Sequence, residues 1–359
     1  MNPSTQMNPS TQMNPSTTQP LNPSTPQLRC GIIGFGKMGR IREEAISEDG
    51  RMTLKSIYEP NFNGELADGV TAVGDADEII NDSSIDAVFV CTPNYRIVPL
   101  VVAALEAGKH VFSEKPPAFS AKEFQSVIEA EKKSGKKLMY GFNHRHHESI
   151  IKAKEVIGSG ELGKIIWMRG RYGKNVDESF FAGWRADAKL AGGGILLDQG
   201  IHMLDLFRNF AGDFDDVQAM ISNDFWKKDI EDNVFAIMRN TSNGISASLH
   251  STMTQWRHLF SLEIFLERGH IVLNGLKTSS GMYGEEELAI AHNNPGGNHT
   301  EEEFLKYSVD RSWFSEVKHF VDCIEKDEEV IHGSSNDALK LMELVDSVYD
   351  SDKLYKRIQ

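Results

Sequence analysis

The sequence has few cysteines and no long apolar run, and both shortages restrict what it can be. Its three cysteines, Cys30, Cys91 and Cys323, are far apart and form no Cys-x-x-Cys pair. Neither a disulfide framework nor a thiolate zinc site is therefore expected, and a reducing, cytoplasmic location is favoured. A membrane-spanning helix needs about 20 apolar residues in a row. No stretch approaches that length, so we expect no membrane association.

Basic residues are also scarce. The 38 lysines and arginines are outnumbered by 52 aspartates and glutamates, and the formal net charge is −14. Nucleic acids are bound through a basic surface that neutralises their phosphates. Because no dense run of lysine or arginine occurs, we expect no nucleic-acid partner. The 359 residues, 40% of them hydrophobic, are enough for two domains with separate cores.

Residues 1–26 differ from the rest of the chain. They repeat Met-Asn-Pro-Ser-Thr-Gln with small irregularities and contain almost nothing that can be buried. This composition predicts a disordered repeat tail. A signal peptide is not expected, because the segment has neither a basic start nor an apolar stretch. We interpret the repeat as a neutral tandem duplication, with a functional linker as the alternative.

Between residues 27 and 146, short apolar strands alternate with helices, which predicts βαβ units and a parallel sheet. The expected strands are 29–34, 52–58, 87–91, 110–113 and 137–141. From 147 to 359 the pattern changes, and strands follow one another through short turns, which favours an antiparallel sheet. These strands are 164–172, 217–226, 233–239, 245–254, 259–267 and 270–274, and two amphipathic helices, 313–324 and 336–349, close the chain.

A glycine-rich motif joins the first strand to the first helix. The run has the form G-x-G-x-x-G and consists of Gly34, Phe35, Gly36, Lys37, Met38 and Gly39. Its glycines permit a tight turn, close approach of a pyrophosphate and close helix–strand packing. The helix N-terminus adds free N–H groups for phosphates. We therefore predict a dinucleotide site, with glycines in a plain turn as the alternative.

Glu59 ends the next strand, about 20 residues after the motif, where an acidic side chain binds the adenosine ribose. A carboxylate at this position repels a 2′-phosphate, so the sequence predicts NAD in preference to NADP.

Two further groups carry chemistry. Glu114 and Lys115 follow a strand end, where open α/β sheets place ligands, and a lysine there can stabilise a developing alkoxide. A surface ion pair between these two residues is the alternative.

Asp198 and His202 follow a glycine run, and four-residue spacing places them on one face of a helix. A carboxylate and an imidazole can then converge on one substrate hydroxyl.

Together these stretches resemble the glucose–fructose oxidoreductase, inositol dehydrogenase and rhizopine-catabolism (Gfo/Idh/MocA) oxidoreductases. The resemblance covers about residues 28–350, and its matched stretches are Gly34–Gly39, Thr92-Pro93-Asn94 with Ala107–Val111, Glu114-Lys115-Pro116, and Gly192–Asp205. One departure is Ile97, where the family often has histidine three residues after the Pro-Asn pair. That position is not expected to be catalytic.

The resemblance implies an α/β fold class. It has an N-terminal Rossmann domain (27–146) and a C-terminal α+β domain (147–359) with a large, mainly antiparallel open sheet. It further implies homodimers or homotetramers built on that sheet, and NAD(P)-dependent chemistry at a secondary hydroxyl of a sugar or cyclitol. Lys115, Asp198 and His202 would be catalytic. The nucleotide would lie against the glycine motif, Glu59, Thr92, Pro93, Asn94, Glu114 and Lys115.

The residue types suggest a mechanism. His202 takes the hydroxyl proton as hydride leaves the same carbon, since the usual histidine pKa of about 6.5 lies near working pH. Lys115 binds the same oxygen, and Asp198 either contacts the substrate or biases His202.

Residues 164–189 are locally basic and lie just before the Asp198 helix. Arginines that converge on a pocket favour an anionic substrate, such as a nucleotide sugar, sugar phosphate or sugar acid. Strand alternation could instead point these charges at solvent. The predicted substrate contacts are Asn143, Arg145, Tyr172, Trp184 and Arg185.

No metal site is expected at His144, His146 and His147, because no acid or cysteine joins them at ligand spacing. Two other functions remain open. An NAD-recycling glycoside hydrolase would keep the same motifs but release no NADH. A non-catalytic ligand sensor is disfavoured because Lys115, Asp198 and His202 are all present.

Overall fold

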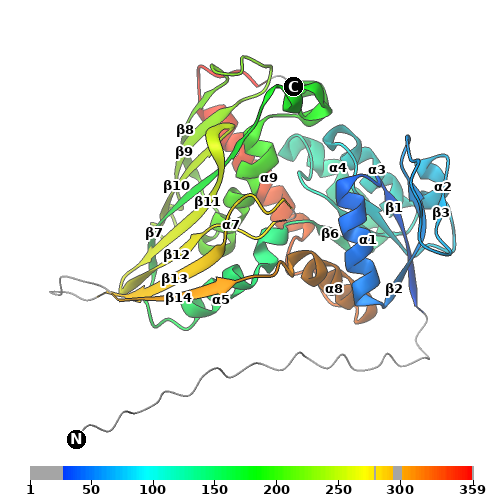
Figure 1. Cartoon of the computed structure of the whole chain (residues 1–359), viewed down its shortest axis with the longest axis horizontal. Coiled ribbons are helices and arrows are strands. Elements are labelled where there is room, and N and C mark those ends of the chain that lie inside the picture. The colour runs from blue at the N-terminus through cyan, green and yellow to red at the C-terminus, as the bar shows by residue number, and fades with distance from the viewer. Residues whose placement is uncertain (1–26, 279, 294–300, 358–359) are drawn as a thin grey trace, which may run out of the picture.

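The computed structural model describes residues 27–278, 280–293 and 301–357. The predicted repeat tail, residues 1–26, lies outside them. Two sheets, each with its own helices, lie side by side (Figure 1). None of the described helices is long and apolar enough to cross a membrane.

The first sheet is the predicted parallel one. Its strands follow the order β3-β2-β1-β4-β5-β6, and every pairing is parallel. The strand order reverses at β1, which lies between β2 and β4, so the carboxyl ends of β1 and β4 border a ligand crevice. The elements are β1 (Leu28–Ile33), α1 (Lys37–Asp49), β2 (Met52–Tyr58), β3 (Thr71–Ala72), α2 (Ala76–Ile80), β4 (Ala87–Val90), α3 (Ile97–Glu106), β5 (His110–Ser113), α4 (Ala121–Ser134) and β6 (Leu138–Tyr140).

The second sheet has eight strands in the order β14-β13-β12-β11-β7-β10-β9-β8. All its pairings are antiparallel except β7 with β10. The mainly antiparallel sheet is therefore confirmed, whereas β13, β14 and the parallel pair were not predicted. The strands are β7 (Ile165–Asn175), β8 (Asp216–Ser222), β9 (Asn233–Arg239), β10 (Ser246–Thr252), β11 (Thr254–Leu266), β12 (Gly269–Asn274), β13 (Glu286–His292) and β14 (Glu302–Tyr307).

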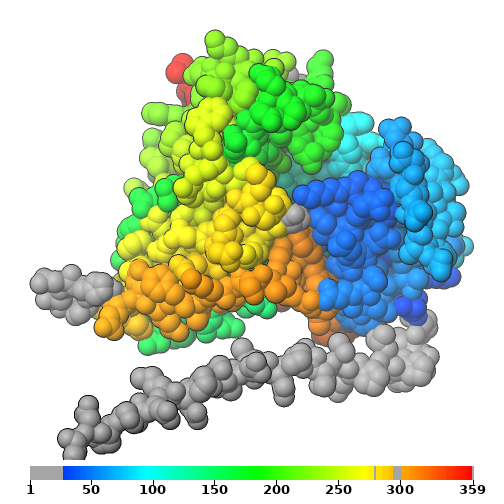
Figure 2. Space-filling model, viewed as in Figure 1, coloured from blue at the N-terminus to red at the C-terminus, as the bar shows by residue number. Residues whose placement is uncertain are grey.

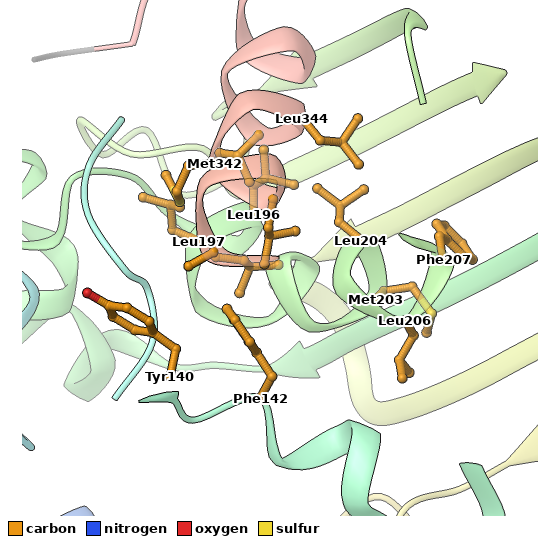
Figure 3. Close-up of a cluster of buried hydrophobic side chains, with 14 of the residues drawn as sticks. Tyr140, Phe142, Leu196, Leu197, Met203, Leu204, Leu206, Phe207, Met342 and Leu344 are labelled. Carbon is orange, nitrogen blue, oxygen red and sulfur yellow. The ribbon is translucent and has the colours of Figure 1, made fainter. Parts of the chain in front are cut away.

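Helices cover one face of this sheet (Figure 1), namely α5 (Glu148–Gly158), α7 (Ile201–Ala211) and α9 (Ser335–Ser351). The close approach of α7 to β7 depends on Gly170. A Cβ there would lie 2.4 Å from Met203 Cγ and 2.8 Å from Phe207 Cζ. Both side chains belong to the buried cluster in which α7 meets α9, together with Leu204 and Leu344 (Figure 3).

Helix α8 (Ser312–Glu325) departs from the predicted division at residue 146. It returns to the first domain and packs against α1. Phe320 meets Phe89 and Phe112 edge-on, with ring centroids 5.8 and 5.7 Å apart, inside the core of the parallel sheet. Residues 147–359 therefore do not form one separate unit, because the apolar face of α8 is buried against the Rossmann sheet.

Candidate active site

A cavity of about 640 Å³ lies where the two domains meet, a size typical of small-molecule sites. The blue first domain and the yellow-to-orange part of the second adjoin along this boundary (Figure 2). All of the predicted nucleotide residues except Phe35 and Gly39 line it. The predicted residues in its wall are Gly34, Gly36, Lys37, Met38, Glu59, Thr92, Pro93, Asn94, Glu114, Lys115, Asn143, Tyr172, Trp184, Arg185, Asp198 and His202.

The glycine-rich turn has the backbone geometry that a dinucleotide needs. Gly34 has a φ of +92°, and a Cβ there would lie 2.5 Å from Cys91 O. A Cβ on Gly39 would lie 2.3 Å from Gly34 O, so this glycine allows α1 to pack close. Gly36 is different, because no atom of the described residues lies within 4 Å of its Cβ position, and it begins α1 without a side-chain cap. Open space beside an uncapped helix N-terminus fits a pyrophosphate.

Glu59 is held at this turn. Its Oε2 accepts a hydrogen bond of 2.9 Å from the backbone N–H of Phe35. The Phe35 ring is buried against Phe62, so Phe35 positions Glu59 rather than lining the cavity. A carboxylate is thus fixed at the end of β2, where the ribose of a dinucleotide lies in this fold.

The Glu-Lys-Pro segment is anchored by a buried ion pair. Arg42, which is fully buried, binds Glu114 Oε1 at 2.7 Å and Glu316 Oε2 at 2.7 Å. This pairing ties the strand end to α1 and α8 and leaves the Lys115 ammonium to point elsewhere. The alternative of an ion pair between Glu114 and Lys115 is not observed among the described residues. Lys115 Nζ instead lies 3.7 Å from Asp198 Oδ1.

Asp198 lies between two lysines. Lys174, on β7, binds Asp198 Oδ2, while Lys115 approaches Oδ1 and also donates to the Asp198 carbonyl oxygen. Burial alone would raise the pKa of Asp198, but the charges of Lys174 and Lys115 outweigh it and hold that pKa below its usual value. The carboxylate therefore stays ionised.

The pKa of Lys115 is also lowered, which for a lysine favours the neutral form. Burial lowers its pKa, and Asp198 opposes this shift. The nearby positive charges of Arg185 and Lys174 add to the lowering. Lys115 is thus a lysine that loses its proton more readily than an exposed one.

The backbone around Asp198 differs from the prediction. Residues Leu196–Gly200 form a π-helical turn before α7 begins. Asp198 and His202 both line the cavity, but no hydrogen bond between them occurs among the described residues. Asp198 therefore faces the lysines and does not orient His202 directly.

The glycine run before this turn lines the cavity with Gly193 and Gly194 and also packs closely on a buried acid. A Cβ on Gly194 would lie 2.1 Å from Glu231 O, and the Glu231 carboxylate accepts hydrogen bonds from the N–H groups of Gly194 and Leu196 at 2.8 and 3.0 Å. Tyr349 donates a further bond of 2.7 Å to the same carboxylate. Here the glycine permits close packing on Glu231, which holds the start of the turn.

His202 is buried and stacked. Its ring lies parallel to that of His144, with centroids 3.9 Å apart and 14° between the planes. Nδ1 of His202 has no hydrogen-bond partner among the described residues. Burial lowers the pKa of His202 well below its usual value, and the charge of Lys115 adds to the effect. The imidazole is therefore neutral and can accept a proton.

Arg145 was predicted to contact the substrate, but its side chain is bound elsewhere. Its guanidinium binds Asp205 with two bonds of 2.7 and 2.6 Å, and Asp337 with one of 2.9 Å. These bonds join the loop after β6 to α7 and α9, and Arg145 does not line the cavity. A buried guanidinium whose donors are paired in this way has a structural role.

The basic segment is divided between the two faces of β7. Arg169 points outward and pairs with Glu263 at 2.6 Å, whereas Tyr172 and Lys174 lie on the inner face and line or border the cavity. Alternation along a strand has this effect. Lys174 was missed as a site residue, although its two-residue spacing from Tyr172 could have placed it there.

Other cavity residues were also missed. His144 was considered only as a metal ligand, yet its Nε2 meets the Tyr172 hydroxyl at 3.2 Å and its Nδ1 meets Asn143 Oδ1 at 3.0 Å. No sequence signal marked Gln199 and Tyr283, which are hydrogen-bonded to each other across the cavity wall. Within the described part of the chain, no group of three or more histidine, cysteine or acidic residues has an arrangement suited to a metal ion.

Comparison with known proteins identifies the family. Residues 28–142 match an oxidoreductase family with an NAD-binding Rossmann fold, and residues 150–272 match the GFO/IDH/MocA C-terminal domain. The chain belongs to the Gfo/Idh/MocA oxidoreductase family. It is therefore an NAD-dependent oxidoreductase of a family that acts on sugars and cyclitols.

Three members of the family show the extent of the similarity. Myo-inositol 2-dehydrogenase of Thermotoga maritima is 27% identical over 270 residues, 72% of this chain and 79% of that one. 1,5-Anhydro-D-fructose reductase of Ensifer adhaerens is 30% identical over 239 residues, 63% and 69% of the two chains. A solved structure of levoglucosan dehydrogenase with NADH and L-sorbose has a TM-score of 0.80 at 25% identity, covering 90% and 96%.

Proposed function

We propose that this enzyme oxidises a secondary hydroxyl of a sugar or cyclitol, or reduces the matching ketone, in the cavity between its domains. The observation that carries this proposal is the convergence of Lys115, Asp198 and His202 on a cavity that also reaches the glycine-rich turn. When bound at that turn, NAD supplies the acceptor or donor of hydride.

His202 is the proton acceptor. Its buried imidazole is neutral, and the stack on His144 fixes the plane of its ring. A neutral imidazole in a fixed orientation meets the two requirements of a general base, a free lone pair and a defined direction. In the reverse reaction the His202 imidazole returns the proton.

Lys115 stabilises the charge that develops on the substrate oxygen. An ammonium aimed at an incipient alkoxide is worth most in a dry site, and this lysine is mostly buried. Asp198 holds Lys115 in place, and Lys174 shares the Asp198 carboxylate. Asn143, Tyr172, Trp184 and Arg185 line the remaining wall and contact the substrate.

The substrate is a neutral sugar or cyclitol. The anionic interpretation depended on a basic segment and on Arg145, but Arg145 is paired elsewhere and Arg169 lies on the outer sheet face. Arg185 is the remaining cavity arginine among the predicted contacts. Myo-inositol 2-dehydrogenase and levoglucosan dehydrogenase, among the relatives, are named for neutral substrates. An anionic substrate bound through Arg185 is the second candidate.

The outer face of the second sheet joins copies of the chain. Large apolar side chains are exposed there, including Met220 (78%), Ile237 (60%) and Ile166 (51%). Contiguous exposed apolar surface marks an interface, and an exposed sheet face is closed by a second copy in many homodimers. Ile237→Asp should convert the assembly to smaller species, as measured by light scattering.

The deciding experiment follows reduced nicotinamide by absorbance, with NAD and a panel of substrates. The panel contains inositol, simple sugars, sugar phosphates, sugar acids and nucleotide sugars. NADH formed with neutral members supports the proposal, and NADH formed only with anionic members favours the second candidate. Cleavage of a glycoside without net NADH would replace both with an NAD-recycling hydrolase.

A variant tests the residue roles. His202→Ala should lower turnover by about 10²- to 10⁴-fold, the usual contribution of a general base. NAD affinity, measured by calorimetric titration, should not change. His292→Ala, which removes an exposed histidine far from the cavity, is the matched control. Unchanged turnover in His202→Ala would reject the assignment of the base.

A further inference from the structure

Four aromatic side chains form a continuous surface beside the cavity. This aromatic shelf consists of Phe181, Phe225, Trp226 and Trp256. The ring centroids of Phe181 and Trp226 are 4.8 Å apart, those of Trp226 and Phe225 are 5.0 Å apart, and those of Phe225 and Trp256 are 5.0 Å apart. Phe225 and Trp256 are each 57% exposed, which is unusual for adjacent large aromatic residues. The segments that carry the shelf adjoin on the surface (Figure 2).

The aromatic shelf begins where the cavity ends. Phe180 lines the cavity, and its ring centroid lies 5.2 Å from that of Phe181. Lys174 Nζ, which binds Asp198, lies 4.2 Å from the centre of the Phe180 ring. At the other end, His258 lines the cavity only two residues after Trp256. A ligand that fills the cavity and extends outward on this side therefore meets the shelf.

A single buried acid, Asp232, holds two of the three segments that carry the shelf. The Asp232 carboxylate accepts hydrogen bonds from the N–H groups of Phe225 and Trp226 at 3.2 and 2.9 Å. The Asp232 carbonyl accepts a bond of 2.7 Å from the Met253 N–H, just before β11, which carries Trp256. The shelf is therefore pre-organised, which reduces the entropy lost when a ligand binds.

The Trp256 backbone is strained in a way that aims its side chain. The pairing of β11 with β7 shifts register between Thr254 and Leu259, and Trp256 within this bulge has a φ of +56°. A bulky residue in the left-handed region costs free energy and is rare outside functional sites. Bulges beside active sites redirect side chains. Beside this bulge His258 lines the cavity, and Trp256 within it is exposed.

We propose that the aromatic shelf binds a second sugar ring, so that the substrate is a glycoside or short oligosaccharide whose reacting ring occupies the cavity. This inference rests on the proposed function. One face of a pyranose presents mainly C–H groups, which pack on flat aromatic rings while the hydroxyls remain solvated. Lys228, whose Nζ lies 5.1 Å from the centre of the Phe181 ring, borders the shelf and can bind those hydroxyls.

The position of the shelf favours a sugar over a second copy of the chain. The broad exposed apolar surface suited to a subunit contact is the outer face of the second sheet, with Met220 and Ile237. The aromatic shelf is instead continuous with the cavity wall and carries flat rings rather than aliphatic side chains. A ligand that already has one ring in the cavity gains the second contact without a new association cost.

The test compares mono- and disaccharides. NADH formation is measured with glucose against cellobiose and maltose, and with inositol against galactinol. In the wild type, kcat/KM should be higher for the two-ring member of at least one pair. Trp256→Ala should lower kcat/KM for that disaccharide by about tenfold, mainly through KM, and leave the monosaccharide unchanged. Trp256→Tyr, which keeps a ring, should restore most of the loss.

Matched controls separate the other outcomes. Phe304→Ala removes an aromatic side chain of similar exposure (53%) from the second sheet and should leave the disaccharide preference intact. A preference unchanged in Trp256→Ala, or equal losses for both sugars, would overturn the inference. So would a change of oligomeric state in Trp256→Ala, measured by light scattering, without a change in preference.

The proposed function can fail separately. If no sugar in the panel yields NADH, binding of cellobiose, maltose and galactinol to the NAD-loaded enzyme is measured by calorimetry. Binding that is tighter than that of the single rings, and that is lost in Trp256→Ala, would support the shelf without the reaction. Binding no tighter than that of the single rings would reject the shelf.

Discussion

On the nucleotide side of the cavity, short contiguous segments form most of the wall, whereas side chains from distant elements form the substrate side. Gly34, Gly36 and Gly39 act through backbone shape. The opposite side depends on Lys115 after β5, Lys174 on β7 and Asp198 in the π-helical turn, held together by charge. Function on the nucleotide side should therefore be lost when a substitution adds volume. Function on the substrate side should be lost when a charge is removed, and it should depend on pH.

The largest effect that separates the two sides is expected from Lys115→Met. It removes the ammonium that stabilises the developing alkoxide, and turnover should fall about 10²- to 10³-fold. Because the glycine motif and Glu59 are unchanged, NAD affinity should fall far less than turnover in a calorimetric titration. Lys189→Met, an exposed lysine, is the control. A parallel loss of NAD affinity would place Lys115 on both sides and weaken the comparison.

Two glycine substitutions test the other side. Gly39→Ala places a Cβ 2.3 Å from Gly34 O, so the turn must shift, and unfolding should become about 1–3 kcal/mol easier. Gly36→Ala meets no atom within 4 Å and should leave stability unchanged. Both should weaken NAD binding by about tenfold or more, since small displacements at a binding site are costly.

Chemical denaturation and NAD titration distinguish these two glycines, with Gly158→Ala as a control in open space. If Gly36→Ala bound NAD normally, the pyrophosphate would not lie against that glycine.

Lys174→Met should have an intermediate effect that depends on pH. Loss of a positive charge raises the pKa of Lys115, which Lys174 helps to lower. Lys115 acts in its protonated form, so activity is lost as pH rises through its pKa. The high-pH side of the pH–rate profile, its basic limb, should therefore move to higher pH in this variant. Turnover at neutral pH should fall about tenfold, because Asp198 loses a partner.

The pH–rate profile of kcat measures the shift. Arg169→Met, on the opposite face of the same strand, should leave the profile unchanged. A basic limb that stayed in place would show that Lys115 does not control it.

The smallest effect is expected from Glu59→Gln. An amide oxygen can still accept the Phe35 N–H bond, so only the charge is removed. Repulsion of a 2′-phosphate should decrease, and the ratio of kcat/KM for NAD to that for NADP should fall about fivefold. Kinetics with both cofactors measure this ratio. No change would mean that the carboxylate does not face the ribose.

The sequence was most informative where function depends on local backbone. The glycine motif, the strand before it and the parallel sheet could all be predicted, because tight turns and βαβ units leave short, ordered signals. The antiparallel sheet followed from the succession of strands. Strands β13 and β14 were missed, since their pairing partners fix them more than their own residues do.

Sequence reasoning was weakest for charged side chains. Arg145 and Lys174 are both basic residues near the predicted site, yet one is bound to Asp205 and the other to Asp198. Arg145 meets Asp205 because the segment after β6 packs on α7, across a gap of 60 residues, and Lys174 meets Asp198 because β7 lies beside the π-helical turn. The periodic pattern of apolar residues in the sequence does not predict such a contact.

The sequence by itself determined the nucleotide-binding fold, the family and the residue types needed for hydride-transfer chemistry, because each depends on local conformation or side-chain identity. Only the tertiary structure decided that Asp198 pairs with two lysines, that His202 stacks on His144, and that α8 completes the first domain. The physical reason is that electrostatics and burial depend on distance in space, and the chain brings these groups together only when both sheets have formed.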